Sequence, residues 1–172
     1  MSSTLFTIGH STRSIEEFLA LLSAHEIAVL ADVRSFPGSR RVPQFGKELL
    51  RVSIEAAGIE YAWMPELGGR RKVSPDSVNT AWRHPAFRGY ADYMETEDFA
   101  DGLMSLTSVA CAMPTAIMCA EAVWWRCHRG LISDAMKWAG FEVLHIMGPG
   151  KVVSHPWTAA AQIVDRELSY TA

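Results

Sequence analysis

The sequence predicts a single α/β domain over residues 1–172, with three layers and a mainly parallel five-stranded sheet between helices, a Rossmann-like arrangement. Short apolar segments alternate with amphipathic helical segments along most of the chain, which is typical of a parallel sheet covered on both faces. The length of 172 residues suits one domain with a substantial core. No repeat, linker or low-complexity segment divides the sequence.

Five short apolar runs are predicted to be the strands of this sheet. They span residues 4–8, 28–33, 59–63, 115–118 and 141–146. Between them, apolar residues recur with helical spacing, which indicates amphipathic helices. The predicted helices begin at residue 15 and otherwise span residues 47–57, 90–95, 97–106, 127–139 and about 156–168.

Residue types at the helix starts support these boundaries. Ser14 and Glu17 have the spacing of a capping box. Thr96 is a suitable N-cap for the helix that follows it. Pro156 suits the first turn of a final helix, where its missing N–H costs no hydrogen bond.

Glycines mark two helix ends, and one long segment has no regular pattern. Gly58 and Gly140 follow predicted helices, as expected because glycine accepts the left-handed backbone that closes a helix. Residues 65–89 show no steady period and are dense in glycine, arginine and proline. A segment of that length is usually functional, so we expect it to cover or border the site.

Polar and reactive side chains stand at the ends of three predicted strands. Right-handed crossovers place the carboxyl ends of parallel strands at one edge of the sheet, where ligands bind in open α/β folds. The residues that should meet there are His10, Ser11, Asp32, Arg34, Cys119 and Glu121.

The segment AIMCAEAVWWRCHR, residues 116–129, is predicted to carry the chemistry. Cys127 stands near a predicted helix start beside His128 and Arg129, surroundings that lower the pKa of a thiol. Cys119 is more ambiguous, since a cysteine at a strand end is often simply packed, and Cys111 is predicted to be structural. The predicted catalytic residues are Cys119, Glu121, Cys127, His128, Asp32 and His10.

Arginine is the dominant cation of the chain and is concentrated in predicted loops. Twelve of the sixteen basic residues are arginine, and the net charge is -3. The planar guanidinium fork suits phosphate and carboxylate groups. An arginine-lined cleft on an acidic scaffold indicates a local anion as ligand. The predicted substrate-binding residues are Ser11, Arg34, Ser39, Arg40, Arg70, Arg71, Arg126 and Arg129.

A set of motifs resembles the family called domain of unknown function 488. They are TIGHS, DVRSFPGSRR, PQF, LGGRRK, FRGYADYM, MCAEAVWWRCHR and HIMGPG, in this order between residues 7 and 150. The resemblance covers most of the chain, and the set is too specific for chance. It implies an α/β fold and a site built from these motifs, and it implies no reaction.

The leading hypothesis is an enzyme that acts on a phosphorylated small molecule, a nucleotide or a nucleic acid. The alternatives are a non-catalytic nucleotide- or nucleic-acid-binding module and a rhodanese-like sulfurtransferase. The rhodanese pattern is incomplete, because bulky Trp124 and Trp125 occupy the loop after Cys119. A Cys-x5-Arg phosphatase motif also fails, since Arg126 comes one residue late. No Walker A or GxGxxG motif is present.

Several further expectations follow from composition. The apolar runs are too short to span a bilayer, which needs about 20 residues, and the N-terminal residues do not read as a secretory signal. Three cysteines in a chain of this size suggest free thiols and a cytoplasmic location. The sequence leaves the cofactor unknown and predicts none. Cys119, Glu121, Cys127, His128 and His10 are suitable ligand types for a metal, which stays a minor alternative because CxxC and HxxxH spacings are lacking. The sequence leaves the oligomeric state open.

Overall fold

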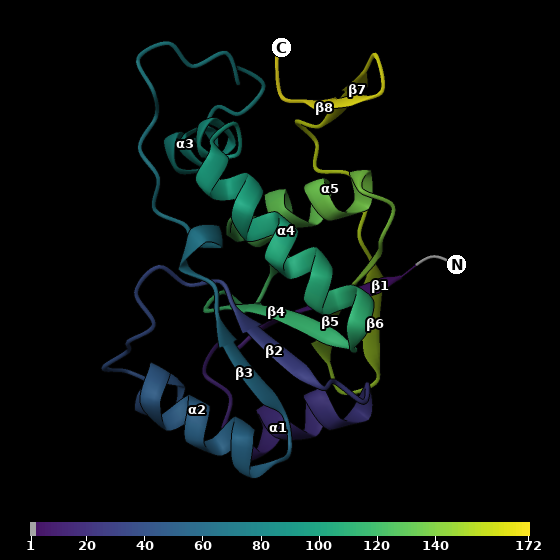
Figure 1. Cartoon of the computed structure of the whole chain (residues 1–172). Coiled ribbons are helices and arrows are strands. Elements are labelled where there is room, and N and C mark those ends of the chain that lie inside the picture. Colours follow the sequence, from purple (N-terminus) through teal and green to yellow (C-terminus); the bar gives the residue numbers. More distant parts are fainter. Residues whose placement is uncertain (1–2) are drawn as a thin grey trace.

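Six strands form one mostly parallel sheet in the computed structural model, which describes residues 3–172 (Figure 1). Their spatial order is β3 (Glu60–Trp63), β2 (Val29–Asp32), β4 (Thr115–Cys119), β1 (Thr4–Gly9), β5 (Glu142–Gly148) and β6 (Lys151–Ser154). The first five pair in parallel, whereas β6 runs antiparallel to β5. The five predicted strands are confirmed, and the predicted count of five is wrong because β6 extends the sheet at one edge.

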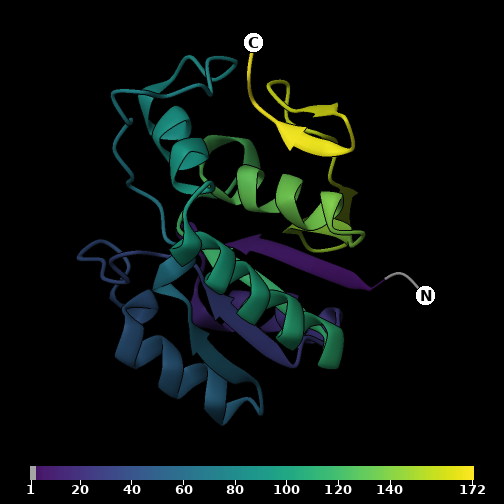
Figure 2. The same cartoon turned by 45° about the horizontal axis from the view of Figure 1, so that its top comes forward.

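Helices pack against both faces of the sheet (Figures 1 and 2). One face carries α1 (Ile15–Ala24) and α2 (Lys47–Ala56). The other carries α4 (Glu97–Ala112) and α5 (Arg129–Trp138), with α3 (Pro85–Tyr93) beside them. Alternate strand residues supply the two cores: Leu5 belongs to the cluster under α4 and α5, and Ile8 to the cluster under α1 and α2. This alternation follows from the two-residue period of a strand.

Helix ends match the sequence signals. The capping box of Ser14 and Glu17 is present, and the Thr96 side chain accepts a hydrogen bond from the start of α4. Gly58 and Gly140 have φ of 79° and 100°, which a residue with a Cβ rarely adopts. Two helices are longer than predicted. The helix α3 begins at Pro85 and not at residue 90, and α4 ends at Ala112 and not at residue 106.

The predicted C-terminal helix from Pro156 is wrong. A two-stranded hairpin of β7 (Gln162–Val164) and β8 (Glu167–Ser169) occupies this region, shown in yellow in Figure 1. Asp165 and Arg166 both have positive φ, of 51° and 71°. Positive φ at both central residues defines the turn that best fits the twist of a hairpin. The turn at Asp165 and Arg166 therefore produces a hairpin here, and Pro156 does not start a helix.

A buried carboxylate attaches the C-terminal segment to the domain. Asp134 of α5 is fully buried. It accepts hydrogen bonds from His155 at 2.8 Å, from the Thr158 hydroxyl at 2.5 Å and from the Tyr170 hydroxyl at 2.7 Å. A buried charge with these partners is satisfied, so the segment after β6 packs on α5.

Close backbone packing at Gly9 fixes the loop that follows β4. Gly9 pairs with Cys119 at the end of β1, and the His10 amide donates to the Cys119 carbonyl at 3.0 Å. A Cβ atom built on Gly9 would lie 1.7 Å from the carbonyl oxygen of Glu121. Glycine is therefore required here, because a side chain would displace the loop.

No helix within residues 3–172 has the length and apolar character that a membrane span requires.

Gly9→Ala is expected to lower the free energy of unfolding by at least about 2 kcal/mol, because the new methyl group clashes with backbone that cannot move freely. Urea denaturation measures this change. Gly148→Ala is the matched control, since a Cβ there meets nothing within 4 Å. Equal stability of the two variants would contradict the proposed backbone contact.

Candidate functional site

A cavity of about 250 Å³ lies at the carboxyl ends of β1, β2 and β4. We call it the central cavity. Residues from the ends of all three strands line it, as the parallel topology predicts. The predicted site residues that line it are His10, Arg34, Ser39, Arg70, Cys119, Glu121, Cys127 and His128.

A second cavity of about 480 Å³ adjoins the first, and we call it the side cavity. Arg70, Glu121, Cys127 and His128 line both cavities. The side cavity adds Arg126 and a set of aromatic rings, which belong to His84, Phe87, Tyr90 and Trp125. The segment 65–89 borders these cavities as expected, although its last residues belong to α3. The residues of this segment that line the side cavity are Gly69, Arg70, His84, Ala86 and Phe87.

A buried ion pair between Asp32 and Arg34 contributes Arg34 to the lining of the central cavity. Asp32 is fully buried and accepts hydrogen bonds from Nε and Nη2 of Arg34, both at 2.8 Å. The Tyr61 hydroxyl donates to the same carboxylate at 2.5 Å. Asp32 is outside the set of cavity-lining residues, so we assign it to positioning Arg34 and not to the predicted catalytic role.

His10 contacts this pair as a neutral acceptor. Its Nδ1–H donates to the Ser11 carbonyl at 2.8 Å, and its Nε2 accepts from Nη1 of Arg34 at 3.3 Å. Its ring stacks on Phe45 at 4.5 Å. Burial lowers the pKa of His10 to about 4, although the hydrogen bond to Ser11 opposes the shift. The lone pair on Nε2 of neutral His10 therefore accepts the hydrogen bond from Arg34.

His128 is neutral for a similar reason. Its Nε2–H donates to the Val33 carbonyl at 2.6 Å. Burial lowers the pKa of His128 to about 4, the bond to Val33 opposing this effect. A Cβ on Gly69 would lie 2.9 Å from Nδ1 of this ring, so the glycine lets residues 68–70 pack against the histidine.

The two cysteines of the segment lie in direct contact. Their sulfur atoms are 3.0 Å apart, and both thiols are free. Burial raises the pKa of Cys119, but a hydrogen bond from Cys127 and the charge of Arg129 outweigh it and lower the value to about 7. The pKa of Cys127 is raised, because its thiol is bound to Cys119 and is buried.

The expectation that the surroundings of Cys127 lower its pKa is thus wrong. The helix start beside Cys127 does contribute, since the Arg129 amide approaches the Cys127 sulfur at 3.4 Å. The contact with Cys119 has the larger effect, and the sequence does not reveal it. With Cys127 donating to Cys119, the contact lowers the pKa of Cys119 and raises that of Cys127.

Arg129 was predicted to bind substrate, but its side chain is buried away from both cavities. Its Nη2 donates to the carbonyls of Glu121 and Ala122 at 3.1 and 3.3 Å. Within residues 3–172 its Nε has no hydrogen-bond partner. Arg129 therefore holds the loop between the cysteines and brings a positive charge to them.

Three other predicted ligand residues also lie outside the cavity linings. Arg71 donates to the carbonyls of Gly68 and Pro65 and lies 3.7 Å from the ring centre of Tyr93. Ser11 contributes its amide to the loop after Cys119, and Arg40 is exposed. Sequence reasoning missed several cavity residues, namely Ser35, Phe36, Gly38, Gly69 and Ala120. The paired glycines of LGGRRK were the available signal for Gly69.

Glu121 is a second charged group that the two cavities share, besides Arg70. Its side chain is exposed and lines both of them. None of the ion pairs formed by residues 3–172 involves it. In the same part of the chain, no group of three or more His, Cys, Asp and Glu side chains could hold a metal ion.

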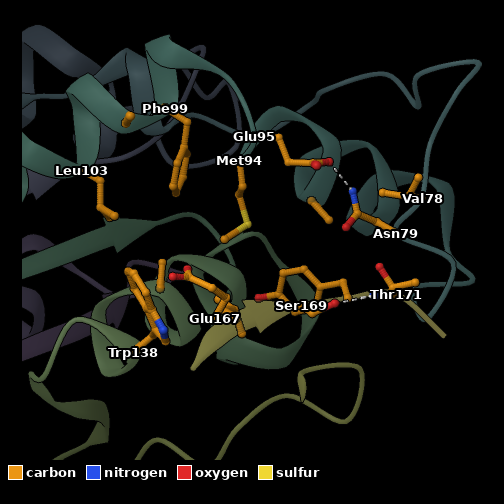
Figure 3. Close-up of a pocket in the computed structure, with 15 residues that line it drawn as sticks. Val78, Asn79, Met94, Glu95, Phe99, Leu103, Trp138, Glu167, Ser169 and Thr171 are labelled. Carbon is orange, nitrogen blue, oxygen red and sulfur yellow. Dashed lines mark hydrogen bonds between the residues drawn. The ribbon is translucent and has the colours of Figure 1, made fainter. Parts of the chain in front are cut away.

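A separate cavity of about 300 Å³ lies between α3, α4 and the C-terminal hairpin (Figure 3). Apolar side chains such as Phe99 and Leu103 line it, with Glu95 and Glu167 among them. Glu95 accepts a hydrogen bond from Asn79 at 2.8 Å. This cavity contains none of the predicted site residues.

The class defined so far is a mixed α/β protein with paired thiols in an arginine-bearing cleft. The family model described as Domain of unknown function DUF488 matches residues 14–136. This match covers more than half of the chain, and the protein belongs to that family. No curated protein and no solved structure matches the chain.

The lowered pKa values of His10 and His128 predict that acid destabilises the protein. The pKa values of His10 and His128 fall from 6.5 to about 4 on folding. Below pH 6.5 the unfolded chain binds protons that the folded chain excludes, so stability is full above that pH and declines toward pH 4. Between pH 7 and pH 5 each histidine should cost about 1–2 kcal/mol, measured by urea denaturation at both values.

His128→Gln is expected to reduce this pH dependence, because its amide can still donate to Val33 and does not titrate. The dependence should not vanish, since His10 remains. Equal or greater stability at pH 5 in the parent protein would contradict the buried neutral state of these histidines.

Proposed function

We propose that this protein is an enzyme that acts on an anionic substrate, with the Cys119 thiolate as nucleophile. The substrate class is a phosphorylated small molecule, a nucleotide or a nucleic acid. One observation carries the proposal: the thiol of lowered pKa and two arginine side chains, Arg34 and Arg70, line the same cavity. Surroundings that perturb the pKa of a nucleophile in a cleft are typical of active sites.

Arg34 and Arg70 contribute to anion binding in different ways. Arg34 is held rigidly by Asp32, which also balances its charge. Arg34 therefore offers an oriented hydrogen-bond donor and no net charge. Arg70 is exposed and has no ion-pair partner within residues 3–172. Arg70 thus supplies the positive charge, and a charged hydrogen bond to phosphate is the stronger kind.

The remaining groups suit proton transfer around an attacking thiolate. The Cys127 thiol keeps its proton near neutral pH and lies 3.0 Å from the Cys119 sulfur. Glu121 stands at the junction of the two cavities and is free to act as a general acid or base. In this proposal His10 and His128 stay neutral and shape the cavity.

A second candidate is a non-catalytic module that binds nucleotides or nucleic acid. The aromatic lining of the side cavity favours it, in particular Trp125, which is 54% exposed. Exposed aromatic rings stack on bases while arginines hold phosphates. The rhodanese-like sulfurtransferase alternative stays a prediction, and thiosulfate treatment would leave an added sulfur on Cys119 if it holds. We also infer a Rossmann-like three-layer fold and a cytoplasmic location.

Arg70→Ala is expected to weaken the binding of inorganic phosphate and of nucleoside monophosphates at least tenfold, because a hydrogen bond to a charged group contributes about 1.5–3 kcal/mol. Isothermal titration calorimetry measures the affinities. Arg34 is the poorer target, since its removal would leave the Asp32 charge buried and unpaired. Unchanged phosphate affinity in Arg70→Ala would contradict the anion site.

Two further variants complete the experiment. Arg51→Ala is the matched control, because Arg51 lies on α2 and pairs only with Glu48 and Glu55 of the same helix. Trp125→Ala should weaken nucleotide binding and leave phosphate binding unchanged if the base stacks in the side cavity. Equal loss for both ligands would instead indicate general damage to the cleft.

A further inference from the structure

The contact between the two cysteines has a chemical consequence beyond anion binding. Cys119 ends β4, and Cys127 lies two residues before α5, so residues 120–126 return the chain to the strand end. The two sulfur atoms are 3.0 Å apart. A disulfide bond is ~2.05 Å long, so the sulfurs need to approach by only about 1 Å.

The flanking backbone differs on the two sides of this contact. Cys119 is fixed within the sheet, where it pairs with Gly9 and accepts from the His10 amide. Cys127 lies in the extended backbone between the short helix η3 (Trp124–Arg126) and α5, next to the exposed residues Trp125 and Arg126. Closure of a bond can therefore be accommodated by Cys127 while the strand stays in place.

The position of Cys119 restricts how a reaction partner reaches its sulfur atom. Its side chain is only 2% exposed, yet it lines the central cavity of about 250 Å³. A reagent reaches this sulfur through the central cavity. A hydroperoxide is small enough to enter, and a thiolate is the form of cysteine that it oxidises.

Arg129 stabilises the reduced form of the pair. Its buried guanidinium, whose side-chain partners within residues 3–172 are only carbonyl groups, lowers the pKa of Cys119. Disulfide formation removes the thiolate and with it the anion that this charge favours. A disulfide whose reduced form is stabilised is readily reduced, which distinguishes this pair from a permanent structural bridge.

We propose that Cys119 and Cys127 form a redox-active dithiol, which a small hydroperoxide converts into a reversible intramolecular disulfide. This reaction uses the same Cys119 thiolate as the function proposed above, but it does not depend on an anionic substrate, because it needs only the two thiols and the peroxide.

The chemistry takes place in two steps. The Cys119 thiolate attacks one oxygen of the peroxide, so that an S–O bond forms and the O–O bond breaks. The leaving oxygen takes up a proton, the peroxide is reduced by two electrons, and Cys119 becomes a sulfenic acid. The Cys127 sulfur then attacks the Cys119 sulfur, an S–S bond forms, the S–O bond breaks, and hydroxide leaves with the Cys127 proton as water.

The test uses Cys111→Ser protein, which removes the exposed thiol on α4 and leaves the pair. Hydrogen peroxide is added, remaining thiols are blocked with iodoacetamide, and the intact mass is measured. We expect a monomer that has lost two hydrogen atoms and takes up no label, and dithiothreitol should restore both labelling sites. Retention of two labelled thiols after peroxide treatment would overturn the proposal.

Single substitutions in the same background separate the two roles. Cys127→Ser should stop at the sulfenic acid of Cys119, which a dimedone adduct identifies. Cys119→Ser should slow the oxidation of Cys127 by at least about tenfold, because the rate follows the thiolate fraction. Equal oxidation of Cys127 with and without Cys119 would contradict the assignment of Cys119 as the attacking thiolate.

Discussion

The ion pair between Asp32 and Arg34 is the constraint on which the candidate site depends. A fully buried carboxylate at the end of β2 is tolerated only because Arg34 and Tyr61 satisfy it. The same arginine donates to His10 at the end of β1. Between the paired residues, the Val33 carbonyl accepts from His128 and the Val33 amide donates to Met118 of β4. Three strand ends and the start of α5 are thus joined through one short segment.

The loop between the cysteines is held from two sides, and its chemistry follows from how it is held. Gly9 lets the Glu121 backbone approach β1, while Arg129 binds the Glu121 and Ala122 carbonyls from α5. This packing brings the two thiols together beside a buried positive charge. Burial alone would raise the pKa of both thiols. The contact with Cys127 and the charge of Arg129 reverse that effect for Cys119 only, and this asymmetry distinguishes a nucleophile from its proton-bearing partner.

Local signals in the sequence predicted the parallel strands and most helix ends, because apolar period and capping residues act over a few positions. The capping box of Ser14 is an example. The same locality explains the errors, since the C-terminal helix was inferred from Pro156 alone, although the chain there folds back onto Asp134. The strand topology brought His10, Arg34 and Cys119 together as predicted. It could not reveal that Arg129 points away from the cavity, because that depends on side-chain packing.

The central claim is that an ionised Cys119 and an anion-binding site share one cavity. The most direct measurement is the rate at which iodoacetamide modifies Cys119 in Cys111→Ser protein, located by peptide mass, as phosphate is added. The account predicts that Cys119 reacts before Cys127, with a half-maximal rate near pH 7. It also predicts that phosphate protects Cys119 in a saturable way. Modification of Cys127 first, or a rate that phosphate leaves unchanged, would contradict the account.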